Sequence, residues 1–242
     1  MKQKYGLQLY SVRDAMKVDF EGTIKKVAEM GYSYVEFAGF FGRTAEEVKA
    51  LLEECGLGVC GSHSSIDDLQ PETIEETIRY HKAIGNENYI LPSIPCSTEE
   101  RLEESLRIIN SAQPMLNAAG IRLSFHNHSR EFESTLWGTT VYSQLELRTN
   151  IDFQLDTYWA WNANTDPVRV MERLGDRIST IHLKDGFKGG KGKPLGEGEA
   201  PVAAIREKAI EMGVIMVVES ETLDPSGLDE AQRCIDHLKS LE

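Results

Sequence analysis

Four short segments in the second half of the chain each end at or next to a side chain that binds metal ions or transfers protons. The segments span 121–126, 151–156, 178–183 and 214–219, and the side chains are His126, Asp156, His182 and Glu219. If each segment is a strand, side chains alternate between its faces, and these four share a face with residues such as Gln154 and Thr180. Parallel strands gather their carboxyl ends at one edge, so we expect the four side chains to meet there.

Imidazole and carboxylate donors without thiolates suit manganese, cobalt or zinc, and they leave positions open for two neighbouring oxygens of a substrate. The alternative interpretation is that these residues are ordinary polar strand ends, hydrogen-bonded within loops. That interpretation is strong for any one of them alone and weak for four at matched positions on successive strands. The sequence therefore favours a metal site made of His126, Asp156, His182 and Glu219.

Two further side chains lie close enough along the chain to take part in proton transfer. His128 follows His126 by two residues, and it either moves a proton or hydrogen-bonds a hydroxyl group. Lys184 follows His182 by two residues and is a candidate to stabilise a developing enolate or alkoxide. The competing interpretations are a histidine that orients neighbouring carboxylates and a solvated lysine beside Asp185.

Three other residues are candidates to bind the substrate. His63 follows a predicted strand among small polar residues, Trp159 offers an aromatic wall for a sugar ring, and Glu36 lies on the second predicted strand. Capping or packing for His63, and packing or oligomer contacts for Trp159, are the structural alternatives.

The elements that must position these residues alternate regularly. Eight predicted strands are each followed by a predicted helix. Gly31, Gly56 and Gly213 are among the glycines that end helices, Asp19 is a predicted cap, and Thr44 opens a capping box with Glu47. Strict alternation indicates a parallel sheet, and eight units in a chain of 242 residues favour closure into a (β/α)8 TIM barrel that forms one domain over residues 1–242. Pro114 is expected to kink or split a long helix ending near Ala119. The segments 158–161 and 186–199 are expected to be an aromatic loop and a mobile lid.

Composition excludes several classes of partner. With 39 acidic and 26 basic side chains the formal charge is −13, which repels nucleic acid and anionic membranes. The four cysteines are scattered without metal-binding or disulfide spacing, the first residues resemble a strand and not a signal peptide, and no segment is apolar enough to cross a membrane. We expect a cytoplasmic protein with a small-molecule substrate, and whether it forms a homo-oligomer is left open.

The segments FHNHSREFE, IDFQLDTYWAW, ISTIHLKDG with the following PLGEGE, and MVVESE resemble the xylose isomerase-like TIM barrel superfamily, over essentially the whole chain. Within it the chain looks most like the bacterial sugar (phosphate) isomerase/epimerase proteins. The resemblance implies a divalent metal, commonly manganese, cobalt or magnesium, and it matches Asp156, His182 and Glu219 to three of the family's ligands.

The fourth ligand is where this chain departs from the pattern. His126 occupies the position that is glutamate in the ketose epimerases of the superfamily, so the resemblance leaves two ligands open: His126 itself, or Glu131, which follows shortly after it. Glu131 is also a candidate acid or base, and its simpler role is to pair with Arg130.

The resemblance implies a sugar or keto-sugar isomerase or epimerase, acting on a sugar or cyclitol by proton transfer through an enediolate. An inosose-type dehydratase or keto-glycoside lyase is the main alternative, because elimination starts from the same intermediate. A DNA-repair endonuclease of the same superfamily fits poorly with an acidic chain, and a non-catalytic sugar-binding barrel is also conceivable. The sequence leaves open which sugar is used and whether it is phosphorylated.

Overall fold

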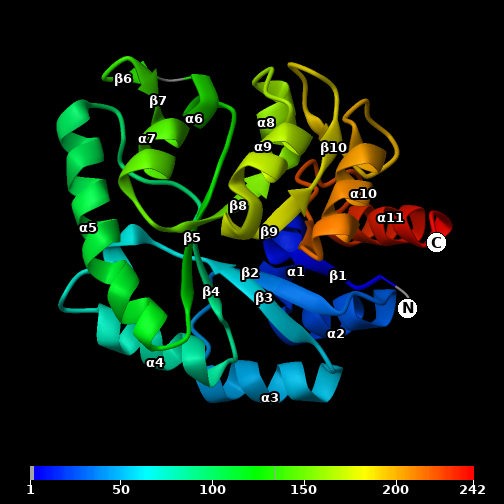
Figure 1. Ribbon diagram of the computed structural model, residues 1–242. Helices are drawn as coiled ribbons and strands as arrows, with labels where there is room; N and C mark the ends of the chain where they lie inside the picture. Colours follow the sequence, from blue (N-terminus) through cyan, green and yellow to red (C-terminus); the bar gives the residue numbers. More distant parts are fainter. Residues whose placement is uncertain (1–2, 134) are drawn as a thin grey trace.

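The computed structural model describes residues 3–133 and 135–242. In this part of the chain eight parallel strands close into a barrel in the order β1-β12-β9-β8-β5-β4-β3-β2. The helices lie on its outside (Figure 1). The barrel strands are β1 (Tyr5–Gln8), β2 (Tyr34–Ala38), β3 (Gly58–His63), β4 (Asn88–Leu91), β5 (Arg122–His126), β8 (Asp152–Asp156), β9 (Ile178–Leu183) and β12 (Ile215–Val218). The predicted (β/α)8 TIM barrel is confirmed.

Capping side chains begin the helices much as the sequence predicts. Asp19 accepts a hydrogen bond from Gly22 N, and Thr44 and Glu47 form a complete capping box. The helices are α1 (Arg13–Val18), α2 (Phe20–Met30), α3 (Ala45–Cys55), α4 (Ile74–Ala83), α5 (Glu99–Ala118), α6 (Arg130–Glu133), α7 (Val141–Arg148), α8 (Thr157–Asn162), α9 (Pro167–Leu174), α10 (Val202–Met212) and α11 (Gly227–Ser240). Three short 3₁₀ helices are η1 (Leu9–Val12), η2 (Ile66–Leu69) and η3 (Gly175–Arg177).

Two local predictions are corrected by the structure. Pro114 lies inside α5, which is one continuous helix and is not split, whereas a kink at Pro114 stays a prediction. The segment expected to be an aromatic loop is the helix α8, because the Asp156 carboxylate accepts a hydrogen bond from Trp159 N at 2.8 Å and caps a new helix directly after β8.

Two small hairpins extend the loops that follow β5 and β9. The first pairs β6 (Thr135–Leu136) with β7 (Thr139–Thr140), and the second pairs β10 (Asp185–Gly186) with β11 (Gly192–Lys193). The second hairpin lies in the segment predicted to be a lid. The mobility of that segment stays a prediction, but its backbone is hydrogen-bonded in a defined conformation.

The barrel separates polar from apolar side chains by strand parity. Phe153 packs against Tyr142 of α7 with ring centroids 4.9 Å apart, as part of the apolar layer between strands and helices. The other face carries Gln8, Glu36, Gln154 and Thr180, which are buried and hydrogen-bonded to one another inside the barrel. The barrel interior below the carboxyl ends of the strands is therefore polar.

Among the described residues, no helix combines the length and the apolar composition needed to cross a bilayer.

Candidate active site

The four predicted metal ligands converge at the carboxyl ends of β5, β8, β9 and β12. His126, Asp156, His182 and Glu219 each offer a donor atom, and these atoms all lie within 4.8 Å of one another. All four side chains are buried. The register explains part of this convergence, because Asp156 of β8 is paired with His182 of β9 and His182 with Val217 of β12.

In the described part of the chain, Asp156 and His126 each have a buried polar atom without a partner. One carboxylate oxygen of Asp156, Oδ1, caps α8, and its main chain is fixed by Asn127, whose side chain bonds both Asp156 N and Asp156 O. Its other oxygen, Oδ2, and Nδ1 of His126 are buried without a hydrogen-bond partner among the described residues. Buried polar atoms are rarely left unpaired, and two such atoms in a group of N and O donors fit a bound cation.

His182 is held from both sides by carboxylates. Its Nε2 lies 2.6 Å from Glu36 Oε1 inside the barrel, and its Nδ1 lies 3.2 Å from Glu219 Oε2 and 3.7 Å from Asp156 Oδ2. Burial would lower the pKa of His182, but the charges of Glu36 and Glu219 outweigh it and raise the pKa well above its usual value. At His126 burial dominates, and the neighbouring His182 adds to it, so the pKa is well below normal and the ring is neutral.

Glu36 is a fully buried carboxylate beneath the cluster, away from the open mouth. Besides His182 it accepts hydrogen bonds from Gln8 at 2.6 Å and Gln154 at 2.5 Å, and His63 Nε2 lies 3.2 Å away. Burial alone would raise its pKa, yet His182 and His63 lower it below the usual value. Both of its oxygens are engaged by protein groups.

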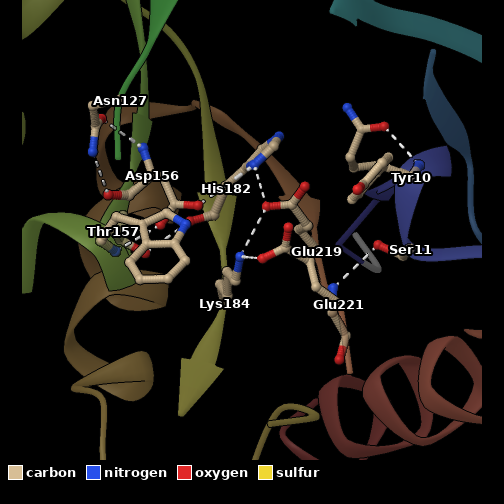
Figure 2. Close-up of polar contacts among 12 residues, drawn as sticks. Tyr10, Ser11, Asn127, Asp156, Thr157, His182, Lys184, Glu219 and Glu221 are labelled. Carbon is tan, nitrogen blue, oxygen red and sulfur yellow. Dashed lines mark hydrogen bonds and ion pairs between the residues drawn. The ribbon is translucent and has the colours of Figure 1, made fainter. Parts of the chain in front are cut away.

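A line of alternating charges runs from Glu219 outward (Figure 2). The buried ammonium of Lys184 lies 3.2 Å from Glu219 Oε2, pairs also with Glu221, and lies 4.8 Å from the centroid of the Trp159 ring. Burial opposes ionisation of Lys184, but Glu219 and Asp156 raise its pKa above the ordinary value. Burial likewise opposes ionisation of Glu219, and Lys184 and His182 hold its pKa well below normal. Both groups are therefore charged.

Of the predicted residues after β5, His128 precedes α6 and Glu131 lies within it. The His128 ring is 5.0 Å from that of His126 and 6.1 Å from that of Trp159, and its Nδ1 is buried without a partner among the described residues. Glu131 does not join the four-residue cluster. Its carboxylate accepts hydrogen bonds from His128 N at 2.7 Å and Arg130 Nε at 2.6 Å.

His63 connects the cluster to a cavity. Its Nε2 lies 2.7 Å from Gln154 Oε1, and its ring centroid is 4.8 Å from that of His126. It also lines a cavity of about 580 Å³ between the ends of β3 and β4. Burial lowers the pKa of His63, and the charge of Glu36 only partly opposes this.

Gln154 and Glu221 take part in the site but were not singled out from the sequence. Gln154 contacts Glu36, His63 and Thr180, and Glu221 pairs with Lys184. A signal existed for both, since each lies two residues from a predicted ligand.

Comparison with known proteins shows the family of the chain. The family model described as xylose isomerase-like TIM barrel matches residues 24–241, which is nearly the whole chain. The chain belongs to this family. Among curated proteins, a 2-oxo-tetronate isomerase from Haemophilus influenzae is 23% identical over 192 residues, or 69% of this chain and 74% of that protein.

Solved structures of other proteins superpose over almost the full length. A sugar phosphate isomerase/epimerase from Parabacteroides distasonis is 25% identical, with a TM-score of 0.84 and coverage of 98% of both chains. A probable 3-DHS dehydratase from Bacillus anthracis is 16% identical, with a TM-score of 0.76 and coverage of 98% of this chain and 99% of that one. The second likeness is one of fold.

Proposed function

We propose that this protein is a divalent-metal-dependent isomerase or epimerase that moves a proton on a sugar or keto-sugar through an enediolate. The observation that carries the proposal is the buried cluster of His126, Asp156, His182 and Glu219, in which two donor atoms lack protein partners. These four residues would hold a manganese, cobalt, zinc or magnesium ion. Such an ion polarises a carbonyl group and so acidifies the neighbouring C–H bond. In this proposal His126, and not Glu131, is the ligand from β5.

Glu36 has a positioning role in this proposal, in place of the substrate contact expected from the sequence. By accepting the Nε2 proton of His182 it leaves Nδ1 directed at Asp156 and Glu219. A carboxylate behind a ligand histidine fixes its ring orientation and its tautomer.

His128 is the proposed acid and base. Its ring lies against both His126 and Trp159, and its unpartnered Nδ1 is free to take a proton from a substrate carbon and return it. Lys184 supplies positive charge beside the negative enediolate oxygen. Glu131 holds the main chain of His128, and a direct role for Glu131 in proton transfer stays a prediction. Trp159, over which the Lys184 ammonium lies, remains the proposed wall for a sugar ring.

Elimination by a dehydratase or keto-glycoside lyase is the second candidate, and His126 favours it. The resemblance gives the ketose epimerases a glutamate at this position, which also acts as an acid or a base. In this chain an imidazole replaces that glutamate, so one member of the acid–base pair differs. In the elimination reaction the same proton is removed, but a hydroxyl or alkoxyl group leaves from the next carbon. Release of water or an alcohol, followed by NMR, distinguishes it from isomerisation.

Deuterium exchange tests the proposal. The full chain, stripped with EDTA and reloaded with Mn²⁺, is incubated in D₂O with a panel of keto-sugars, and carbon-bound deuterium is measured by NMR. Exchange is expected with Mn²⁺ and is expected to disappear with EDTA or in Asp156→Asn. The control is Asp236→Asn, on the exposed side of α11. Exchange that persists in EDTA would show that the proposal is wrong.

A further inference from the structure

The cavity beside His63 is a second feature of the barrel mouth, distinct from the cluster. It lies between the segments 63–67 and 92–95, and Arg130 of α6 closes one side. Its volume of about 580 Å³ is within the roughly 300–1,000 Å³ of small-molecule sites. Among the described residues that line it, His63 is the link to the cluster, whereas His126, Asp156, His182 and Glu219 are not part of the lining. A substrate whose reacting carbons lie at the cluster can therefore extend past His63 and fill this cavity with another part of itself.

The lining has the polarity of a site for hydroxyl groups. Ser65 and Ser93 present hydroxyls, Asp67 and Arg130 contribute one negative and one positive charge, and Pro95 adds an apolar wall. Among the described residues, Ser93 Oγ has no hydrogen-bond partner, and Ser65 Oγ is bonded by Asp67 N at 3.1 Å. Hydroxyl groups both donate and accept, so they pair with a mixed set of this kind.

One hydrogen bond holds the guanidinium of Arg130 in place, and its other N–H groups have no protein acceptor among the described residues. Its Nε donates to the buried carboxylate of Glu131, which is itself fixed by His128 N. In the described part of the chain no other acceptor lies within hydrogen-bond distance of its guanidinium, so the terminal nitrogens are free to donate to a ligand. Phosphate sites usually gather more than one cation or a set of backbone N–H groups. Here the lining holds one arginine together with Asp67, and that balance of charge disfavours a phosphate.

We infer that this cavity is a subsite for a neutral, hydroxyl-bearing second moiety of the substrate, such as a second sugar ring. The protein then prefers a glycosyl-extended sugar to a free monosaccharide or a sugar phosphate. The inference rests on the proposed function, because it takes the cluster as the place where the reacting carbons bind.

Binding measurements with three ketoses test the subsite. Mn²⁺-loaded full chain is titrated in a calorimeter with D-fructose, D-fructose 6-phosphate and lactulose, a galactosyl-fructose. Lactulose is expected to bind at least about tenfold more tightly than fructose, roughly the effect of one well-placed set of hydrogen bonds. The phosphate is expected to give no such gain.

A cavity-filling variant assigns the effect to this place. Ser93→Trp changes an exposed serine in the lining, and Ser240→Trp changes an exposed serine at the end of α11 as the matched control. The preference for lactulose over fructose should fall to less than about twofold in Ser93→Trp and persist in Ser240→Trp, because the introduced ring fills the space that a second sugar requires.

The outcomes separate this inference from the proposed function. Equal affinities, tightest binding of the phosphate, an unchanged preference in Ser93→Trp, or no binding of lactulose would each overturn the subsite. If Mn²⁺ still binds and keto-sugars still exchange deuterium in those cases, the proposed function stands. Failure of Mn²⁺ to bind the wild-type chain would instead refute the proposed function.

Discussion

At this site, single side chains use one polar atom to bond the protein and direct a second polar atom into the cluster. Asp156 caps α8 with Oδ1 and leaves Oδ2 in the cluster, and His182 bonds Glu36 through Nε2 while Nδ1 faces Asp156 and Glu219. Because protein contacts fix one polar atom of each side chain, the side chain loses little conformational entropy when a ligand binds to the other atom. The donors are thus preorganised by contacts that do not involve the ligand.

Glu36→Gln tests preorganisation at this scale. Glutamine has nearly the same shape, but it is uncharged and has one acceptor oxygen where Glu36 uses two, for His182 and for Gln154. The hydrogen bond that orients His182 is therefore weakened, and Mn²⁺ affinity should fall about 10- to 100-fold. Calorimetric titration with Mn²⁺ measures the change, and Glu72→Gln, on an exposed residue before α4, is the control. An unchanged affinity in Glu36→Gln would remove Glu36 from the proposed site.

At the scale of elements, the hairpin β10–β11 and the turn after it are held by one buried carboxylate. Asp185 accepts hydrogen bonds from the backbone N–H groups of Gly186 and Ala200 through Oδ1, and from those of Gly196 and Gly198 through Oδ2. The crowding at Gly198 shows how close the backbone approaches, since a Cβ there would lie 2.3 Å from Gly186 N. These hydrogen bonds therefore fix the backbone of this segment, which forms a wall beside Lys184.

Asp185→Asn should loosen this wall. The amide retains one acceptor and turns an NH₂ group toward two backbone N–H groups, which costs about 1–3 kcal/mol for each donor left unpaired. Limited trypsin digestion should cut after the exposed Lys188 and Lys191 at least about tenfold faster than in the wild type. The reason is that the lost hydrogen-bond free energy raises the population of the locally opened segment. The control is Asp176→Asn, an exposed residue of η3. Equal cleavage rates in Asp185→Asn would contradict this account of the hairpin.

For the whole molecule, folding buries histidines in an acidic chain, and this makes stability depend on pH. Among them His81 of α4 is not part of the cluster. It is 3% exposed, and its Nδ1 lies 2.8 Å from the Asn86 amide nitrogen. Burial lowers its pKa from 6.5 to about 4. Since the unfolded chain binds this proton below pH 6.5 and the folded chain only below about 4, its contribution to stability is complete above pH 6.5 and is lost as the pH falls toward 4.

Urea unfolding of wild type and His81→Gln at two pH values measures this contribution. Between pH 7 and pH 5 the wild type should lose about 2 kcal/mol more of its free energy of unfolding than the variant, which lacks the titrating ring. The control is Ser240→Gln, at an exposed residue of α11 that does not titrate, and it should lose as much as the wild type. Parallel pH dependences in wild type and His81→Gln would show that His81 is not buried in its neutral form.

The sequence by itself determined the features that depend on residues close together along the chain. Alternation of strands and helices, the caps at Asp19 and Thr44, and the parity that puts Gln154 and Asp156 on one face all follow from spacings of two to four residues. Given eight such units, closure brings the strand ends together, which is why the meeting of His126, Asp156, His182 and Glu219 was predictable.

Only the tertiary structure decided which of the competing partners each side chain takes. Glu36 meets Gln154 from 118 positions away and lies beneath the cluster, not at its rim, whereas Glu131 meets its own neighbours and stays outside it. The cavity beside His63 likewise forms from the end of β3, the segments that follow β3 and β4, and α6, which come together only in the folded barrel. The physical reason is that a buried charge takes whichever partner the closed barrel brings within hydrogen-bond distance, and short-range sequence patterns do not contain that distance.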